Sequence, residues 1–154
     1  MTRLRPVSDA DRDFLVALYG STREEELARV DWDDELKRAF VEQQFSAQDV
    51  HYRSNYPGAT LDVVEVDGEA AGRLYVHRGR SDIRIMDIVL APEFRGRGIG
   101  TALLHELIAE ADGSGRKLSI HVEYNNPART LYDRLGFRPV GEHGVYLLLE
   151  RPPS

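Results

Sequence analysis

Several kinds of residue and segment are missing from this sequence of 154 residues. It has no cysteine, which excludes a disulfide scaffold, a cysteine nucleophile, thiolate zinc sites and iron–sulfur clusters. Its five histidines are scattered and form no H-E-x-x-H pattern, so we expect no metal site. Any chemistry therefore has to use oxygen and nitrogen groups.

Long apolar runs and an excess of basic residues are also missing. No stretch approaches the ~20 apolar residues that a membrane span needs, and none follows the charged N-terminal residues. We therefore expect a soluble, cytoplasmic protein without a membrane partner. The net charge of −6 argues against a nucleic-acid partner, because neutralising phosphates needs clustered Lys and Arg.

The residues that are present predict one globular domain. The composition is 42% hydrophobic and 30% charged, which is typical of a single core at this length, so we expect one domain over residues 1–150 and a flexible tail at 151–154. Strand and helix patterns alternate in the order βα(α)βββαβαβ, which predicts an α/β fold with a mixed, mostly antiparallel twisted sheet flanked by helices. The first expected strand begins at Leu4, and the others cover residues 61–66, 71–77, 83–90, 118–122 and 145–149. The expected helices cover residues 8–20, parts of 31–52, 100–111 and 128–135. We expect the sheet to split where strands 83–90 and 118–122 part.

A glycine-rich segment, Arg95-Gly96-Arg97-Gly98-Ile99-Gly100-Thr101, lies between the expected strand 83–90 and the expected helix 100–111. A helix start carries unpaired N–H donors and a partial positive charge, so glycines there suit a pyrophosphate, with Arg95 and Arg97 as cationic donors. The segment lacks the Gly-Lys-Ser/Thr ending of a Walker loop, and the third glycine of the dinucleotide fingerprint would fall on Thr101. Taken alone, a tight strand-to-helix connection with incidental arginines explains it equally well.

Two ordered motifs lie in the C-terminal half of the sequence. Arg95, Gly98 and Gly100 fit the pattern R-x-x-G-x-G, and residues 125–137 fit N-x-x-A-x-x-L-Y-x-x-L-G-F. In these two motifs the sequence resembles the GCN5-related N-acetyltransferase (GNAT) family. The motifs and the strand before them cover about a third of the chain. The resemblance implies a GNAT-like single domain that transfers an acetyl group from acetyl-CoA to a primary amine by direct attack in a ternary complex. The alternative is a non-catalytic module of the same fold that binds acyl-CoA.

The resemblance implies coenzyme contacts in three places, all assigned by motif position. The pyrophosphate would be held by the N–H groups of Arg95, Gly96, Arg97, Gly98, Ile99, Gly100 and Thr101. The backbone of Ile88, Val89 and Leu90 would pair with the pantetheine arm like an added strand, with a backbone N–H around Leu90 meeting the oxyanion, and Asn125 would also contact the coenzyme.

Tyr132 and Asp87 are the candidate catalytic residues. By motif position Tyr132 would protonate the leaving thiolate, since a phenol of pKa ~10 can serve a thiol of pKa ~8.5. Without the resemblance, packing beside Leu131 and Leu135 would be the better explanation of this tyrosine. Asp87 shares a strand face with apolar residues, where partial burial would make its carboxylate a stronger base. An ion pair of Asp87 with Arg84 or Arg73 explains it equally well.

The acceptor side has weaker signals. Gln43, Gln44, Gln48 and Tyr52 follow Phe40 at helical spacings and are candidates to line an acceptor pocket, with ordinary helix surface as the alternative. Glu123 shares a strand face with His121; the two are better explained as satisfied polar residues, although either could relay a proton. The acids at 24–26 and at 31, 33 and 34 would attract a cationic amine, and a solvated helix face explains them at least as well. The acceptor, a small-molecule or peptide amine, stays open, as does the oligomeric state, a homodimer included.

Overall fold

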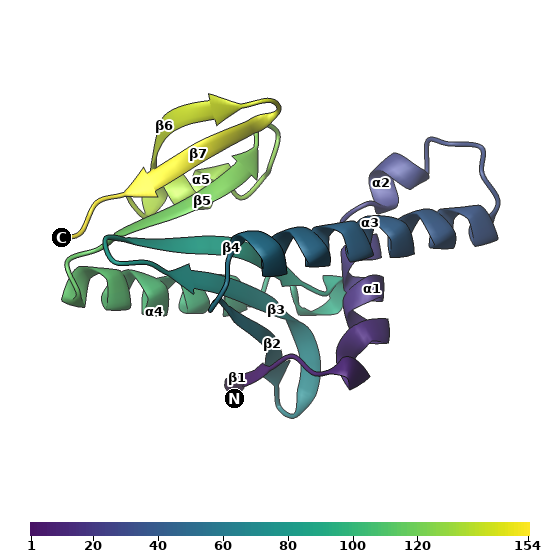
Figure 1. Cartoon of the computed structure of the whole chain (residues 1–154), viewed down its shortest axis with the longest axis horizontal. Helices are drawn as coiled ribbons and strands as arrows, with labels where there is room; N and C mark the ends of the chain where they lie inside the picture. The colour runs from purple at the N-terminus through teal and green to yellow at the C-terminus, as the bar shows by residue number, and fades with distance from the viewer. The chain divides into compact units, whose positions relative to one another are not determined.

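The computed structural model describes all 154 residues (Figure 1). The elements follow in the order β1 (Thr2–Pro6), the 3-10 turn η1 (Asp9–Asp11), α1 (Arg12–Ser21), α2 (Glu24–Leu27), α3 (Asp34–Asn55), β2 (Thr60–Val66), β3 (Glu69–Arg78), β4 (Asp82–Leu90), η2 (Pro92–Phe94), α4 (Ile99–Gly113), β5 (Lys117–Glu123), α5 (Arg129–Arg134), β6 (Arg138–His143) and β7 (Tyr146–Arg151). None of these helices combines the length and apolar character that crossing a lipid bilayer requires.

The strands form one seven-stranded sheet in the order β1-β2-β3-β4-β5-β7-β6. The pairs β1–β2, β5–β7 and β6–β7 are antiparallel, whereas β4–β5 is parallel. The sheet is therefore mixed and mostly antiparallel, and the predicted α/β fold class is confirmed. The parallel register runs from Asp82 opposite Lys117 to Ile85 opposite Ile120, while β4 continues to Leu90 and β5 to Glu123. This short register agrees with the expected parting of the two strands.

Contacts along the chain group into two compact units, the first comprising residues 1–74 and 88–97 and the second residues 75–87 and 98–154. In the first unit α1 packs against α3, with the rings of Tyr19 and Phe45 edge to face at 6.5 Å. Helix α3 starts where the Asp33 carboxylate accepts a hydrogen bond from the Leu36 N–H at 2.8 Å. This cap satisfies one of the unpaired donors of the first turn. One long helix covers most of the segment 31–52, for which the sequence predicted one or two helices, and it continues to Asn55.

The first unit also contains a polar cluster at its N-terminal strand. Both oxygens of the Asp11 carboxylate accept hydrogen bonds from the Arg5 guanidinium, at 2.8 and 2.9 Å, and the Ser8 N–H donates to one of them at 2.8 Å. Arg5 also donates to Glu65 on β2 at 2.7 Å. The hydrogen bonds from Arg5, with a smaller contribution from Ser8, lower the pKa of the buried Asp11 carboxyl to about 2.

In the second unit α4 packs on β5. The apolar residues that recur along α4 are buried, as are those on the strand face beneath it: Leu103, Leu104, Leu107 and Ala111 on the helix, and Ile83, Ile85, Leu118, Ile120 and Val122 on the strands. The apolar residues follow helical spacing on α4 and alternate along β4 and β5, and together they form one core, as the sequence predicted.

Two features differ from the prediction at the C-terminal end. Strand β6 was missed because it is an edge strand with mostly exposed residues, and its register with β7 shifts between Pro139 and Gly141, so no alternating pattern marks it. Arg151 belongs to β7 rather than to the expected tail, since its guanidinium donates to the Leu135 carbonyl and to Asp112, both at 2.8 Å.

Candidate active site

The glycine-rich segment forms the connection between β4 and α4. After the 3-10 turn η2, Gly96 has φ +74° and Gly98, the N-cap of α4, has φ +79°. Both lie in the left-handed region that favours glycine, and a Cβ atom at either position would meet nothing within 4 Å. Because Gly98 has no side chain that could cap the helix, the first N–H groups of α4 remain for water or a ligand. The connection is therefore open at the point where a helix offers its donors.

The two arginines of the segment help to hold its shape. The Arg95 Nε donates to the Leu90 carbonyl at 3.0 Å, and its other end reaches the Ser21 hydroxyl on α1 at 3.3 Å. The Arg97 guanidinium lies 5.2 Å from the ring centre of Phe94, which is buried. Both arginine side chains are exposed. Their predicted role as phosphate donors stays a prediction, whereas the contact of Arg95 with Leu90 fixes the connection to the end of β4.

The end of β4 is held closely by β3. The Ala91 N–H donates to the Ala71 carbonyl at 2.7 Å, and a Cβ atom on Gly72 would come within 2.2 Å of the Val89 carbonyl oxygen. Only glycine allows this approach, because the atom it would strike is rigid backbone. Gly72 thus sets the backbone path at the end of β4, where residues Ile88 to Leu90 are expected to pair with the pantetheine arm. Sequence reasoning missed it, since an isolated glycine in a strand pattern does not show what lies opposite.

Tyr132 is buried on α5, only 4% exposed, and its ring lies 5.5 Å from that of Phe137, edge to face. Tyr132 therefore packs in the core, which is the role that the sequence suggested for it apart from the family resemblance. Burial, with a further contribution from the negative charge of Asp87, raises the pKa of Tyr132 to about 12. The phenol is consequently protonated throughout the neutral range. Its pKa also depends on the charge of Asp87, the other candidate catalytic residue.

Asp87 is a half-buried residue of β4. Of the two arginines considered as ion-pair partners, Arg84 donates to the Ser119 hydroxyl at 2.7 Å and lies 3.9 Å from Asp82. Arg73, 3% exposed, donates to Gln48 at 2.5 Å. Each of these arginines therefore donates a hydrogen bond to a residue other than Asp87. The choice between base and ion pair stays a prediction.

The turn after β5 contains the second motif. Asn125 is exposed there, while its neighbour Asn126 shapes the turn by accepting a hydrogen bond from the Ala128 N–H at 2.8 Å. Glu123 is half-buried at the end of β5, and its carbonyl accepts from the Asn126 N–H at 3.0 Å. The motif therefore leaves Asn125 accessible and uses Asn126 for local structure.

His121 has a polar partner on the neighbouring strand. Its Nδ1 lies 3.3 Å from a guanidinium nitrogen of Arg84. Partial loss of hydration, together with the positive charges of Arg84 and His143, lowers the pKa of His121 below 6.5, so the ring is neutral at pH 7. The guanidinium can only donate, so Nδ1 accepts, which favours the satisfied polar residue over a free base.

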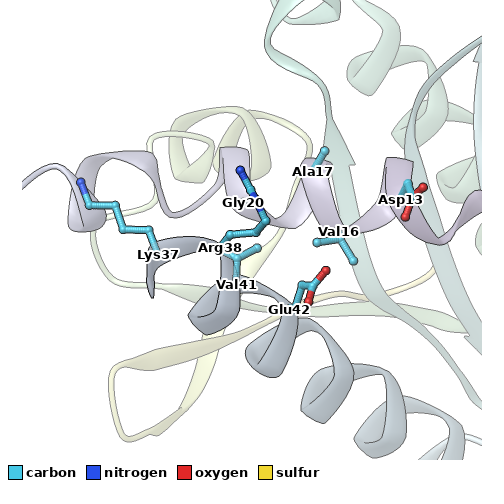
Figure 2. A pocket seen from close by; sticks show the side chains of 8 residues that line it. All are labelled: Asp13, Val16, Ala17, Gly20, Lys37, Arg38, Val41 and Glu42. Carbon is cyan, nitrogen blue, oxygen red and sulfur yellow. The ribbon is translucent and has the colours of Figure 1, made fainter. Parts of the chain in front are cut away.

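The residues expected at an acceptor pocket lie on α3. Gln44, Gln48 and Tyr52 are half-buried, whereas Gln43 is exposed. The Gln48 side chain is tied to Arg73, whose guanidinium also lies 5.9 Å from the ring centre of Phe45. The groove between α1 and α3 is lined by other residues (Figure 2). An acceptor role for these side chains and for Glu123 stays a prediction.

Comparison with known proteins decides the family. The model of the acetyltransferase (GNAT) family matches residues 23–137, which include both motifs. The chain belongs to the GNAT family. A protein of Bacillus subtilis (strain 168), named as a candidate alanine N-acetyltransferase of ribosomal protein bS18, is 37% identical over 89 residues. The match covers 55% of this GNAT chain and 58% of the relative, so it spans little more than half the length of that protein.

Solved structures show the same fold over the whole chain. The PaiA N-acetyltransferase of Thermoplasma acidophilum, crystallised in complex with coenzyme A, has a TM-score of 0.72 at 18% identity and covers 99% of both chains. The ribosomal-protein-S18-alanine N-acetyltransferase of Escherichia coli has a TM-score of 0.64 at 18% identity and covers 100% of this chain and 95% of its own. The fold is therefore that of GNAT acetyltransferases.

Proposed function

We propose that this GNAT protein transfers an acetyl group from acetyl-CoA to a primary amine by direct attack in a ternary complex. The observation that carries the proposal is the open glycine connection at the start of α4, where Gly98, the first glycine of the R-x-x-G-x-G motif, and the neighbouring Gly96 both have backbone in the left-handed region. Coenzyme A bound in the structurally similar Thermoplasma protein supports the choice of donor.

The connection suits the pyrophosphate for electrostatic reasons. Uncapped N–H groups and the positive end of the α4 dipole favour a negatively charged group at this place. The space beside Gly96 and Gly98 is free, so phosphate oxygens can approach the backbone. We assign pyrophosphate binding to the N–H groups of residues 95–101, pantetheine pairing to Ile88–Leu90, and a further coenzyme contact to Asn125.

Asp87 and Tyr132 divide the proton transfers in this proposal. The acceptor amine must lose a proton because a primary ammonium group has a pKa of ~10.4, and Asp87 accepts it directly or through water. The amine nitrogen bonds to the acetyl carbon, the carbon–sulfur bond breaks, and the sulfur leaves with the electron pair. Tyr132 then protonates the thiolate.

The electrostatic contact between the two groups suggests an order for these steps. The negative charge of Asp87 is one of the two causes that raise the pKa of Tyr132 to about 12, the larger being burial. Once Asp87 has taken up the proton of the amine, its charge is gone and the pKa of Tyr132 falls. Tyr132 thus becomes a better acid after the amine has been deprotonated, when the leaving thiolate needs the proton.

Among acceptors, the names of the relatives favour a polypeptide amine. The Bacillus and Escherichia proteins are both named for an alanine of a ribosomal protein. We propose that Gln44, Gln48, Tyr52 and Glu123 contribute to the acceptor side. A screen of small amines, aminoglycosides and peptides with free amino termini would identify the class.

Coenzyme binding is tested by calorimetry on Gly98→Asp. The substitution adds a side chain and a negative charge where the pyrophosphate approaches, so we expect no measurable affinity for coenzyme A or acetyl-CoA. Gly58→Asp is the matched control, because Gly58 has φ +81° and equally open surroundings outside the segment. Full affinity in a folded Gly98→Asp protein would refute the proposed site.

Thiol release separates the enzyme from the binding module. An enzyme releases free coenzyme A from acetyl-CoA when the right amine is added, whereas a binding module shows thermal stabilisation by coenzyme A and no release with any acceptor. Stabilisation without release over the whole acceptor screen would replace the proposed reaction by the binding function.

A further inference from the structure

A buried guanidinium on β3 holds one of the glutamines of α3. Arg73 is 3% exposed, and its guanidinium donates a hydrogen bond to the Gln48 Oε1 at 2.5 Å. The same guanidinium lies 5.9 Å from the ring centre of Phe45, about one turn before Gln48 on α3. The preceding residue, Gly72, lies against the Val89 carbonyl, so the backbone that carries Arg73 is fixed as well. Arg73 is therefore held at both ends of its side chain.

The chemistry of this contact decides how the Gln48 amide is oriented. A guanidinium carries only donors, so the amide oxygen faces Arg73 and the amide nitrogen points away from it. A flipped amide would set the N–H groups of both side chains against each other at a buried guanidinium, which costs free energy. The Gln48 Nε2 forms no hydrogen bond within the chain, and the residue is only half-buried. Gln48 therefore offers N–H donors to a ligand on the side away from Arg73.

We infer that Arg73 makes Gln48 a hydrogen-bond donor that selects acceptor amines with a neighbouring carbonyl group. The inference rests on the proposed acetyl transfer, with Gln48 on the acceptor side, and it narrows the acceptor to the amino-terminal residue of a polypeptide. The amine and the first carbonyl group of such a residue are attached to the same carbon atom, so a donor that binds the oxygen also positions the nitrogen. A lysine side chain has no carbonyl group beside its amine. Gln48 is then a specificity-determining residue, and Arg73 is the residue that positions it.

Two properties of the contact keep the amide from turning to suit another acceptor. A hydrogen bond with a charged donor is stronger than one between neutral groups, and a guanidinium keeps its charge throughout the neutral range. Burial of Arg73 also restricts the access of water that could replace Gln48 as its partner. An acceptor without a carbonyl group would leave the Gln48 donors unpaired once it excludes water from them. Sites that hydrogen-bond one group of a substrate reject analogues without it for this reason.

Kinetics with two peptide acceptors test the inference. One peptide begins with a free alanine and contains no lysine, and the other has the same sequence with a blocked amino terminus and one lysine. The ratio of their kcat/KM values measures the selection, and differences in the reactivity of the two amines cancel when this ratio is compared between variants. We expect the wild-type protein to favour the free amino terminus. Gln48→Glu keeps an oxygen toward Arg73 but loses the N–H donors, so the ratio should fall by at least about tenfold.

Arg73→Met should lower the ratio as well, because the Gln48 amide is then free to turn. Its matched control is Arg12→Met, since the Arg12 guanidinium lies 5.4 Å from the same aromatic ring but donates to the Ser46 hydroxyl at 3.0 Å. Ala47→Glu controls for the added charge, because Ala47 is the exposed neighbour of Gln48 on α3. Both controls should keep the wild-type ratio. Calorimetry should show that Gln48→Glu keeps its affinity for coenzyme A, so that the loss lies on the acceptor side.

The outcomes separate this inference from the proposed function. A wild-type ratio in Gln48→Glu, or a wild-type protein that prefers the lysine peptide, overturns the inference and leaves the acetyl transfer intact. A wild-type ratio in a folded Arg73→Met protein removes Arg73 from the selection. Circular dichroism shows whether this variant folds; if it does not, Gln48→Glu decides alone. Transfer to neither peptide overturns the inference too, and the acceptor screen then decides the proposed function by itself.

Discussion

Tyr132 has two roles at the scale of a single residue, one in the core and one in the proposed chemistry. Its ring packs against Phe137, while burial and the charge of Asp87 raise its pKa to about 12. A phenol with this pKa keeps its proton at neutral pH and is a weak acid. The proposed reaction therefore needs the charge of Asp87 to be neutralised before Tyr132 gives its proton to sulfur.

Replacing Tyr132 by Phe removes the proton and keeps the ring. We expect kcat to fall by about 100-fold, the lower range for loss of a general acid, with the dissociation constant of coenzyme A almost unchanged. Steady-state kinetics and calorimetry on the same preparation measure the two effects. Equal turnover in both proteins would remove Tyr132 from the mechanism.

Replacing Asp87 by Asn tests the contact between the two groups without any substrate. The pKa of Tyr132 should fall from about 12 and stay above 10, because the carboxylate charge is lost and burial remains. Carbon-13 NMR of labelled tyrosine measures this, with Tyr132→Phe assigning the signal. Asp133→Asn, at the next position of α5, is the control and should leave the titration unchanged; an identical curve for Asp87→Asn would contradict the coupling.

At the scale of the element, the end of β4 depends on β3. The Val89 carbonyl and the Leu90 Cα lie where a side chain at residue 72 would begin, and Arg95 binds the Leu90 carbonyl from the connection that follows. The strand end is therefore positioned from two sides before any ligand arrives. Such positioning is what a backbone that pairs with a ligand requires.

Gly72→Ala should disturb this arrangement. A Cβ atom 2.2 Å from the Val89 oxygen forces the backbone of β4 to move, so we expect a loss of about 1–3 kcal/mol in the free energy of unfolding and weaker coenzyme binding. Gly113→Ala, at the end of α4 with nothing within 4 Å, is the control and should be neutral or slightly stabilising. Denaturant titration and calorimetry measure both effects. Wild-type stability and affinity in Gly72→Ala would show that the strand end yields without cost.

At the scale of the whole molecule, native-state contacts make stability depend on pH. The pKa values of Asp11, Glu65, Glu110 and Asp112 are all lowered, in each case first by a hydrogen bond from an arginine. The unfolded chain takes up these protons first as the pH falls, so acid destabilises the native protein. The lowered pKa of His121 acts in the same direction below about pH 6.5.

Asp11→Asn isolates the largest of these contributions. At pH 7 we expect it to lower the free energy of unfolding by about 2 kcal/mol, because Arg5 loses a charged partner. The wild-type advantage should be complete above about pH 4 and vanish between about pH 4 and pH 2, the unfolded and native pKa values of Asp11. Thermal unfolding across this range measures it, with Glu69→Gln as the exposed control. A constant difference down to pH 2 would contradict the assigned pKa.

The sequence by itself determined the features that depend on near neighbours in the chain. Helical spacing in α4, the hairpin of β2 and β3 and the glycines before α4 act over a few residues, so their elements and the family motifs were predicted correctly. Strand β6 was not, because an edge strand with a shifted register carries no alternating pattern.

Tertiary structure alone decided which distant residues meet. The charge of Asp87 raises the pKa of Tyr132, and Arg73 donates a hydrogen bond to Gln48. Gly72 lies against the Val89 carbonyl. These contacts depend on strand register and on helix packing, which local patterns do not encode, and they set the pKa of Tyr132 and the backbone path of β4 on which the proposed function rests.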